Sequence, residues 1–137
     1  MNPYLSFPNS DCKAAFDLYQ RVLGAKCVFM HTWAQSPMAD QAPGGNGEAI
    51  MHATLQMPDG TILMGADCPP EYGQPFGGFS LSVNCNDVAE AERVFAGLSE
   101  GGKVTMPLEK TFWAERFGMC NDAHGVPWMV NCEMRPD

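Results

Sequence analysis

Apolar residues recur at helical spacing in residues 11–23. Ala15, Leu18, Tyr19 and Val22 share one helical face, with Ser10 or Asp11 as the N-cap and Gly24 as the stop. The pattern predicts one amphipathic helix over this segment.

A second helix is predicted to begin after Asp87. Asp87 and Glu90 resemble a capping box, and Gly101 and Gly102 end the helix. Its apolar face carries Val88, Ala91, Val94, Phe95 and Leu98.

Short segments of alternating apolar residues predict strands around both helices. They are 4–7, 25–34, 48–57, 61–67, 77–85, 103–109, 114–121 and 126–133. The predicted order is strand, helix and three strands, twice over. We therefore expect an α+β fold made of two βαβββ modules.

The two halves also share residues at matching intervals. Residues 11–19 and 87–95 both carry an acid, an alanine and an aromatic ring in the same places, and 58–64 and 123–129 share a glycine and a methionine. We interpret 1–137 as one domain, with module one at about 1–67, a linker at 68–76 and module two at about 77–137. A cleft is expected between the duplicated halves.

Residues 35–47 lack any periodic pattern and contain three glycines. They are predicted to form a loop, either a mobile cover for a site or a tolerated surface insertion.

Charge and composition exclude several classes of function. The net charge of −8, without a cluster of Lys or Arg, argues against a nucleic acid or an anionic membrane as partner. No signal peptide or long apolar run is present, so we expect a cytoplasmic protein. The six cysteines contain no Cys-x-x-Cys pair and are expected to be free thiols. Cys12 is the exception, because a position at a helix start can lower the pKa of a thiol.

The chain resembles the vicinal-oxygen-chelate superfamily of glyoxalase I, bleomycin-resistance proteins and extradiol dioxygenases. Within it, residues 4–7, His52, 111–118 (Thr-Phe-Trp-Ala-Glu-Arg-Phe-Gly) and 122–131 (Asp-Ala-His-Gly-Val-Pro-Trp-Met-Val-Asn) resemble the PhnB-like proteins. The resemblance implies a glyoxalase-like fold, with a curved mixed sheet around a cleft, and a homodimer.

The resemblance also locates the superfamily's four metal ligands, usually His and Glu, on the first and last strand of each module. Here those positions hold Tyr4, Met64, Gly78 and Met129. Phenol, thioether and glycine do not replace carboxylate and imidazole as ligands of a divalent ion. We therefore expect neither a metal site nor a cofactor.

Strand alternation predicts which side chains line the cleft. Ala49, Met51, Ala53, Leu55 and Met57 should pack on the helix, as should Phe79, Leu81 and Val83. The expected cleft residues are Tyr4, Ser6, Glu48, His52, Thr54, Gln56, Met64, Gly78, Ser80, Ser82, Met129 and Asn131.

His52 is the candidate catalytic residue, because imidazoles exchange protons near neutral pH. A structural role, with one hydrogen bond donated within the sheet, is the alternative. Trp113 and Arg116 are further candidates for ligand binding, since an indole beside a guanidinium can stack on a planar anion. The alternative for Phe112 and Trp113 is a core or dimer contact, whereas Trp128 is predicted to lie in the core.

These observations favour a small-molecule-binding protein without the superfamily metal. The predicted ligand-binding residues are Tyr4, Ser6, His52, Thr54, Met64, Ser80, Trp113, Arg116 and Met129. The alternative is a lyase, isomerase or dioxygenase-type enzyme that uses His52 as acid–base or, with Glu48, as a metal ligand. A homodimer is expected, with Phe112 or Trp33 at the contact.

Overall fold

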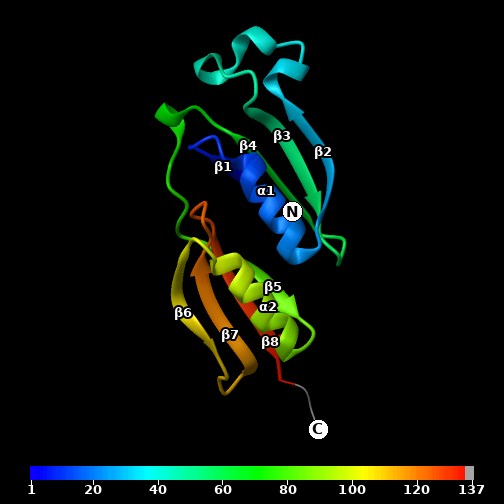
Figure 1. Ribbon diagram of the computed structural model, residues 1–137, viewed down its shortest axis with the longest axis vertical. Coiled ribbons are helices and arrows are strands. Elements are labelled where there is room, and N and C mark those ends of the chain that lie inside the picture. The colour runs from blue at the N-terminus through cyan, green and yellow to red at the C-terminus, as the bar shows by residue number, and fades with distance from the viewer. Residues whose placement is uncertain (135–137) are drawn as a thin grey trace. The chain divides into compact units, whose positions relative to one another are not determined.

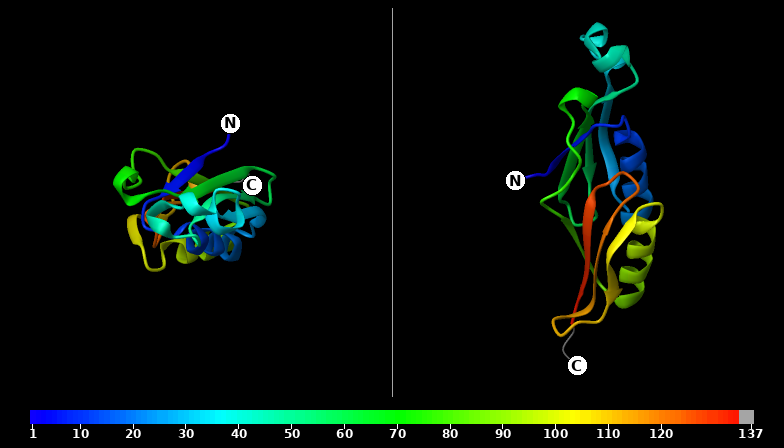
Figure 2. Two further views of the ribbon diagram at one scale, coloured as in Figure 1. Left: turned by 90° about the horizontal axis from the view of Figure 1, so that it is seen from above. Right: turned by 90° about the vertical axis from the view of Figure 1, so that its left-hand side faces the viewer.

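The computed structural model describes residues 1–134 and divides into two compact units, Met1–Pro75 and the part that begins at Phe76. Each unit consists of a strand, a helix and three strands, as the sequence predicts (Figure 1). Each helix packs against one face of the sheet in its own unit (Figure 2). We call the opposite face of each sheet its outer face.

The first unit contains a four-stranded mixed sheet in the order β1-β4-β3-β2. β1 is parallel to β4, and the other neighbours are antiparallel. The elements are β1 (Tyr4–Phe7), α1 (Cys12–Leu23), β2 (Lys26–Thr32), β3 (Ile50–Gln56) and β4 (Ile62–Asp67). All five lie within the predicted segments.

Helix α1 forms where the apolar spacing predicts it. Ala15, Phe16, Leu18, Tyr19 and Val22 are buried against the sheet. Gly24 ends the helix in the left-handed conformation, at φ 70°, and its N–H bonds the carbonyl of Gln20. Asp11 is the N-cap residue, but its side chain makes no capping hydrogen bond.

The start of α1 is instead bonded by Asp67, a buried carboxylate at the end of β4. Asp67 Oδ1 accepts the backbone N–H of Cys12 at 3.0 Å, and Oδ2 accepts that of Ile50 at 2.8 Å. The carboxylate therefore ties the first turn of α1 to the start of β3, and the two amides offset the cost of burying its charge.

The second unit repeats the topology in the order β5-β8-β7-β6, with β5 parallel to β8. Its elements are β5 (Leu81–Cys85), α2 (Val88–Ser99), β6 (Lys103–Glu109), β7 (Ala114–Asn121) and β8 (Pro127–Glu133). The Asp87 side chain accepts the N–H of Glu90 at 2.8 Å and caps α2. Trp128 is buried, as predicted.

The predicted start of β5 at residue 77 is wrong. The strand begins at Leu81, and Gly78 adopts the left-handed conformation at φ 77°. Phe79 was expected to pack inward but is 41% exposed, because it precedes the strand and alternation does not apply to it. Gly78 and Ser80 lie outside the strand for the same reason.

Strand β2 ends at Thr32, and a short 3₁₀ turn at Trp33–Gln35 takes the place of the last two residues of the predicted strand. The segment expected to be irregular contains a second 3₁₀ turn at Ala39–Gln41 and a third at Pro43–Gly45, which the left-handed Gly44 interrupts at φ 61°. Backbone hydrogen bonds close its base, from Trp33 to Ala49 and from Ala34 to Gly47. Between residues 1 and 134, no helix combines the length and the apolar character that crossing a membrane requires.

Candidate functional site

A row of four side chains crosses the outer face of the first sheet, one from each strand. The register pairs Tyr4 with Met64, Met64 with Thr54, and Thr54 with Phe29. Paired residues point to the same face of a sheet, so these side chains are neighbours. The opposite face carries the buried Leu5, Ala53 and Leu55, which confirms the alternation predicted for β1 and the middle of β3.

His52 lies beside this row and is hydrogen-bonded through both ring nitrogens. Its Nδ1 is 3.1 Å from the Tyr4 hydroxyl, and its Nε2 is 3.0 Å from Oγ1 of Thr54. A neutral imidazole has one donor and one acceptor nitrogen, and each hydroxyl can take the complementary role. The two contacts therefore fix the orientation of the ring.

Two aromatic rings flank His52. The ring centroids of Tyr4 and Phe29 lie 5.6 Å and 5.7 Å from that of His52. Tyr4 is 48% exposed and Phe29 is 43% exposed, so both rings offer surface to a ligand. Burial of its remaining part is the main cause that raises the pKa of the Tyr4 phenol. The phenol is therefore protonated at neutral pH and available as a donor.

The polar residues at the ends of β3 differ from the expectation. Glu48 was placed on the strand with His52, but β3 begins at Ile50, and the exposed Glu48 belongs to the preceding loop. There its backbone N–H bonds Asn46 Oδ1 at 3.1 Å. Lys26, paired with Gln56, is the charged residue at the far end of this face. Among the paired residues around His52, none is a carboxylate or a lysine.

The second sheet carries different groups at the equivalent places, with methionines in three positions of the matching row. Ser82 pairs with Met129, Met129 with Met119, and Met119 with Met106. In the next row the register pairs Asn84 with Asn131, Asn131 with Phe117 and Phe117 with Glu109. Phe117 thus occupies the position that His52 has in the first sheet. The second sheet has a polar contact of its own, because Asn131 Nδ2 donates a hydrogen bond to Asn84 Oδ1 at 3.3 Å, but it has no imidazole.

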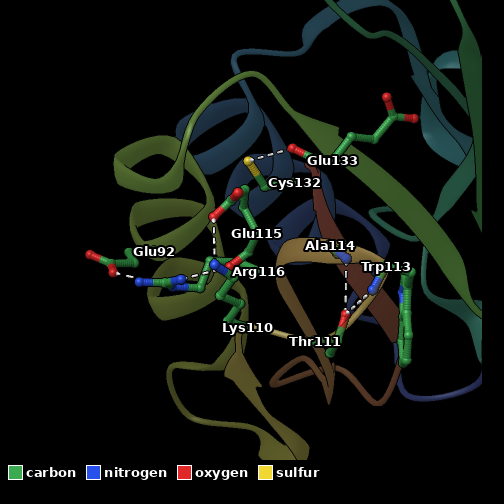
Figure 3. Close-up of polar contacts among 9 residues, drawn as sticks. All are labelled: Glu92, Lys110, Thr111, Trp113, Ala114, Glu115, Arg116, Cys132 and Glu133. Carbon is green, nitrogen blue, oxygen red and sulfur yellow. Dashed lines mark hydrogen bonds and ion pairs between the residues drawn. The ribbon is translucent and has the colours of Figure 1, made fainter. Parts of the chain in front are cut away.

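Trp113 and Arg116 do not form the stacked pair that the sequence suggested. Figure 3 shows the guanidinium turned toward α2, where Arg116 Nε lies 3.8 Å from Glu92 Oε1. Trp113 instead contacts Phe117, with ring centroids 5.6 Å apart. Arg116 and Phe117 are consecutive on β7 and point to opposite faces, which explains the separation.

Sequence reasoning missed Phe29, His31, Met119 and Phe117 as outer-face residues. The positions of Phe29 and His31 follow from the register of β2, which shifts at irregularities between Cys27 and Phe29 and again between His31 and Thr32. Period-two alternation in 114–121 was a usable signal for Phe117 and Met119.

The resemblance implies that the metal ligands of the superfamily lie on the first and last strand of each module. The paired residues there are Tyr4 with Met64 and, in the second unit, Ser82 with Met129, because Gly78 precedes β5. Phenol, hydroxyl and thioether groups do not fit a hard or borderline divalent ion. Over the described residues 1–134, no cluster of three or more His, Cys, Asp or Glu side chains is arranged to hold a metal.

None of the cysteines with a shifted pKa is an activated nucleophile, because each of these pKa values is raised. Burial raises the pKa values of Cys85 and Cys120 to about 11, and it also raises that of Cys68. The expectation that the helix start activates Cys12 is wrong. Burial, followed by the charge of Asp67, raises the pKa of this thiol and keeps it protonated.

Known proteins share this architecture. The family model of the Glyoxalase/Bleomycin resistance protein/Dioxygenase superfamily matches residues 3–130. Protein YjdN of Escherichia coli is 35% identical over 139 residues, which cover 96% of this chain and 93% of that protein. The chain therefore belongs to the glyoxalase/bleomycin resistance protein/dioxygenase superfamily.

Solved structures agree with this assignment. The crystal structure of protein PA1353 from Pseudomonas aeruginosa has a TM-score of 0.88 and 43% identity, covering 98% of both chains. A PhnB protein from Bacillus cereus has a TM-score of 0.79 over 96% of this chain and 98% of that chain. Its identity is 24%, so this likeness shows the fold alone.

Proposed function

We propose that this protein binds a small, uncharged, planar organic molecule on the outer face of the first sheet. The proposed binding does not use a divalent ion held between strands β1 and β4 or between strands β5 and β8. The observation that carries the proposal is the placement of the Tyr4 and Phe29 rings on either side of His52. Membership of the superfamily supports a small-molecule ligand in general.

The aromatic residues supply the apolar part of the proposed site. Exposed faces of Tyr4 and Phe29 offer stacking surface to a flat ring, and Met64 and Thr54 lie between them in the row. A methionine adapts its shape to a ligand at low cost. This combination favours a ring system over a flexible chain.

The polar residues set the expected charge of the ligand. The Tyr4 hydroxyl, the His52 ring and the Thr54 hydroxyl are hydrogen-bonding groups without formal charge when the imidazole is neutral. A charged ligand would lose water here without gaining an opposite charge in the row. We therefore expect neutral phenols or heteroaromatic compounds to bind more tightly than their anionic analogues.

An acid–base enzyme is the second candidate, and the fixed orientation of His52 favours it. A ring nitrogen 3.1 Å from the Tyr4 hydroxyl can pass a proton to or from a bound substrate through that hydroxyl. In this role His52 is the base, Tyr4 relays the proton and Thr54 holds the ring.

The ligand experiment uses a fluorescent neutral naphthol as a probe and naphthalenesulfonate as its charged counterpart. We expect saturable binding of the naphthol, weaker binding of the sulfonate, and a loss of about tenfold or more in Phe29→Leu, which removes the stacking ring. Phe79→Leu is the matched control, because this ring is 41% exposed, much like Phe29, and belongs to the other unit. Equal effects of the two substitutions would contradict the proposed site.

His52→Gln separates the two candidate functions. A binding protein retains most of its naphthol affinity in this variant, because the aromatic rings remain. An enzyme loses turnover of any co-purified compound, which native mass spectrometry of the purified protein would first identify.

We also infer a cytoplasmic homodimer. Phe112 is 89% exposed and contacts Trp113, with ring centroids 4.8 Å apart, so the turn between β6 and β7 presents an aromatic pair to a second copy.

A further inference from the structure

We propose that His31 and His52 form a two-imidazole chelate for a borderline divalent ion of the Ni²⁺, Cu²⁺ or Zn²⁺ class. The proposed site lies on β2 and β3, away from the β1–β4 and β5–β8 pairs of the superfamily metal. It involves His52 but does not depend on the proposed organic ligand.

The register places the two histidines directly opposite each other. His31 of β2 is the antiparallel partner of His52 of β3. Side chains paired in this way share a face, and their Cβ atoms are typically about 4.5–5.5 Å apart. Two imidazoles mounted at this spacing can turn their nitrogens toward a common ion.

Phe29 marks the side of the sheet on which both rings lie. Its ring centroid is 4.7 Å from that of His31 and 5.7 Å from that of His52. Met30, between Phe29 and His31, pairs with the buried Ala53 on the helix side. The two histidines are therefore on the outer face.

His31 is the accessible half of the pair. It is exposed, β2 is an edge strand, and within residues 1–134 its ring nitrogens have no hydrogen-bond partner. A register shift follows immediately, between His31 and Thr32. Such irregularities redirect side chains and are frequent beside functional sites.

His52 is the oriented half of the pair. An ion that replaces the Thr54 hydroxyl at Nε2 leaves Nδ1 to donate its proton to the Tyr4 oxygen. A second hydrogen bond of this kind fixes the tautomer and orientation of histidine ligands in metal sites. The Thr54 hydroxyl turns away by rotation about one bond.

The ligand chemistry selects the ion. Neutral imidazole prefers late first-row ions, whereas Mg²⁺ and Ca²⁺ prefer oxygen. The net charge of −8 raises the local concentration of cations. Two protein ligands leave coordination positions open for water or for a donor atom of a small molecule.

The test is calorimetric titration of the untagged protein with NiCl₂, without any organic ligand. We expect a single Ni²⁺ per chain, no binding of Mg²⁺, and affinity at least about tenfold weaker in His31→Gln and in His52→Gln. His124→Gln is the matched control, because His124 is the remaining histidine and lies in the other unit. Imidazole proton signals of His31 and His52, but not of His124, should broaden when paramagnetic Ni²⁺ is added.

Unchanged nickel affinity in His31→Gln, or the absence of nickel binding by the native protein, would overturn the chelate. Because His31 is exposed, its substitution leaves the fold intact, which circular dichroism verifies. Naphthol binding distinguishes this failure from that of the proposed function, since His31→Gln removes neither Tyr4 nor Phe29. Nickel binding without naphthol binding would support the chelate and contradict the organic site.

Discussion

The hydroxyl of Tyr4 on β1 lies 3.1 Å from Nδ1 of His52 on β3, although β4 separates their strands. The contact is diagonal, because Tyr4 pairs with Met64 and Met64 with Thr54, two residues from His52. The first strand of the module thus controls the orientation of the imidazole.

Removing this hydroxyl should release the His52 ring without removing its aromatic neighbour. In Tyr4→Phe we expect a changed tautomer population of His52, seen in its ¹⁵N chemical shifts, and a loss of about 1 kcal/mol or less in the free energy of unfolding, because the bond is partly exposed. Tyr72→Phe, at an exposed position, is the control. Unaltered His52 shifts in Tyr4→Phe would show that the contact is not populated.

Asp67→Asn should destabilise the first unit. The amide presents an NH₂ group to one of the two backbone N–H donors, of Cys12 or Ile50, and leaves that donor unpaired. We expect the free energy of unfolding in urea to fall by about 2 kcal/mol. Asp17→Asn, which removes an exposed ion pair with Lys13, should change it by about 0.5 kcal/mol or less. Similar effects of both substitutions would contradict the structural role that we assign to Asp67.

Buried thiols predict a loss of stability at alkaline pH. The pKa of Cys120 is raised in the folded protein from its ordinary value of 9.0 to about 11, chiefly by burial and then by Asp122. Its contribution is therefore fully present below the unfolded pKa and is lost as pH rises from about 9 toward 11. Cys120→Ala should reduce this pH dependence, measured as urea stability across that interval.

Val130→Ala is the control for the cavity that Cys120→Ala creates. Val130 is buried on the same sheet and does not titrate, so its truncation should lower stability equally at each pH. If the two variants have the same alkaline slope, the thiol is not the cause.

Gly118 on β7 occupies a place where a side chain does not fit. A Cβ there would lie 2.9 Å from Leu108 Cα on β6 and 2.9 Å from the Phe95 ring on α2. Gly118→Ala should cost about 1–3 kcal/mol of stability in urea unfolding. Gly77→Ala, where nothing lies within 4 Å of the added atom, should be close to neutral. A neutral Gly118→Ala would mean that α2 and β6 move apart easily.

The homodimer prediction rests on the exposed aromatic turn between β6 and β7. Light scattering should give about twice the chain mass of 14.9 kDa for the native protein and a shift toward monomer for Phe112→Ser. Tyr72→Ser, at another exposed aromatic residue, should leave the mass unchanged. A native protein that scatters as a single chain would contradict the prediction.

The sequence by itself determined the elements, their order and most of the buried positions. Helices α1 and α2 are predicted by apolar residues three and four apart, because this spacing places side chains on one face of a helix. Alternation likewise placed Leu55 inside and Thr54 outside, because the side chains of a strand change face at every residue. The residue types at Tyr4, Met64 and Met129 likewise differ from the His and Glu ligands that the resemblance implies.

Tertiary structure alone decided which of these residues meet. Strand register depends on pairing between segments far apart in the chain and on local irregularities, neither of which leaves a periodic signal. That is why Phe29 and His31 were found beside His52 only in the fold, and why β5 starts at Leu81. The ion pair of Arg116 also depends on the tertiary structure. Its partner Glu92 lies on α2, and no local sequence pattern predicts how close α2 comes to β7.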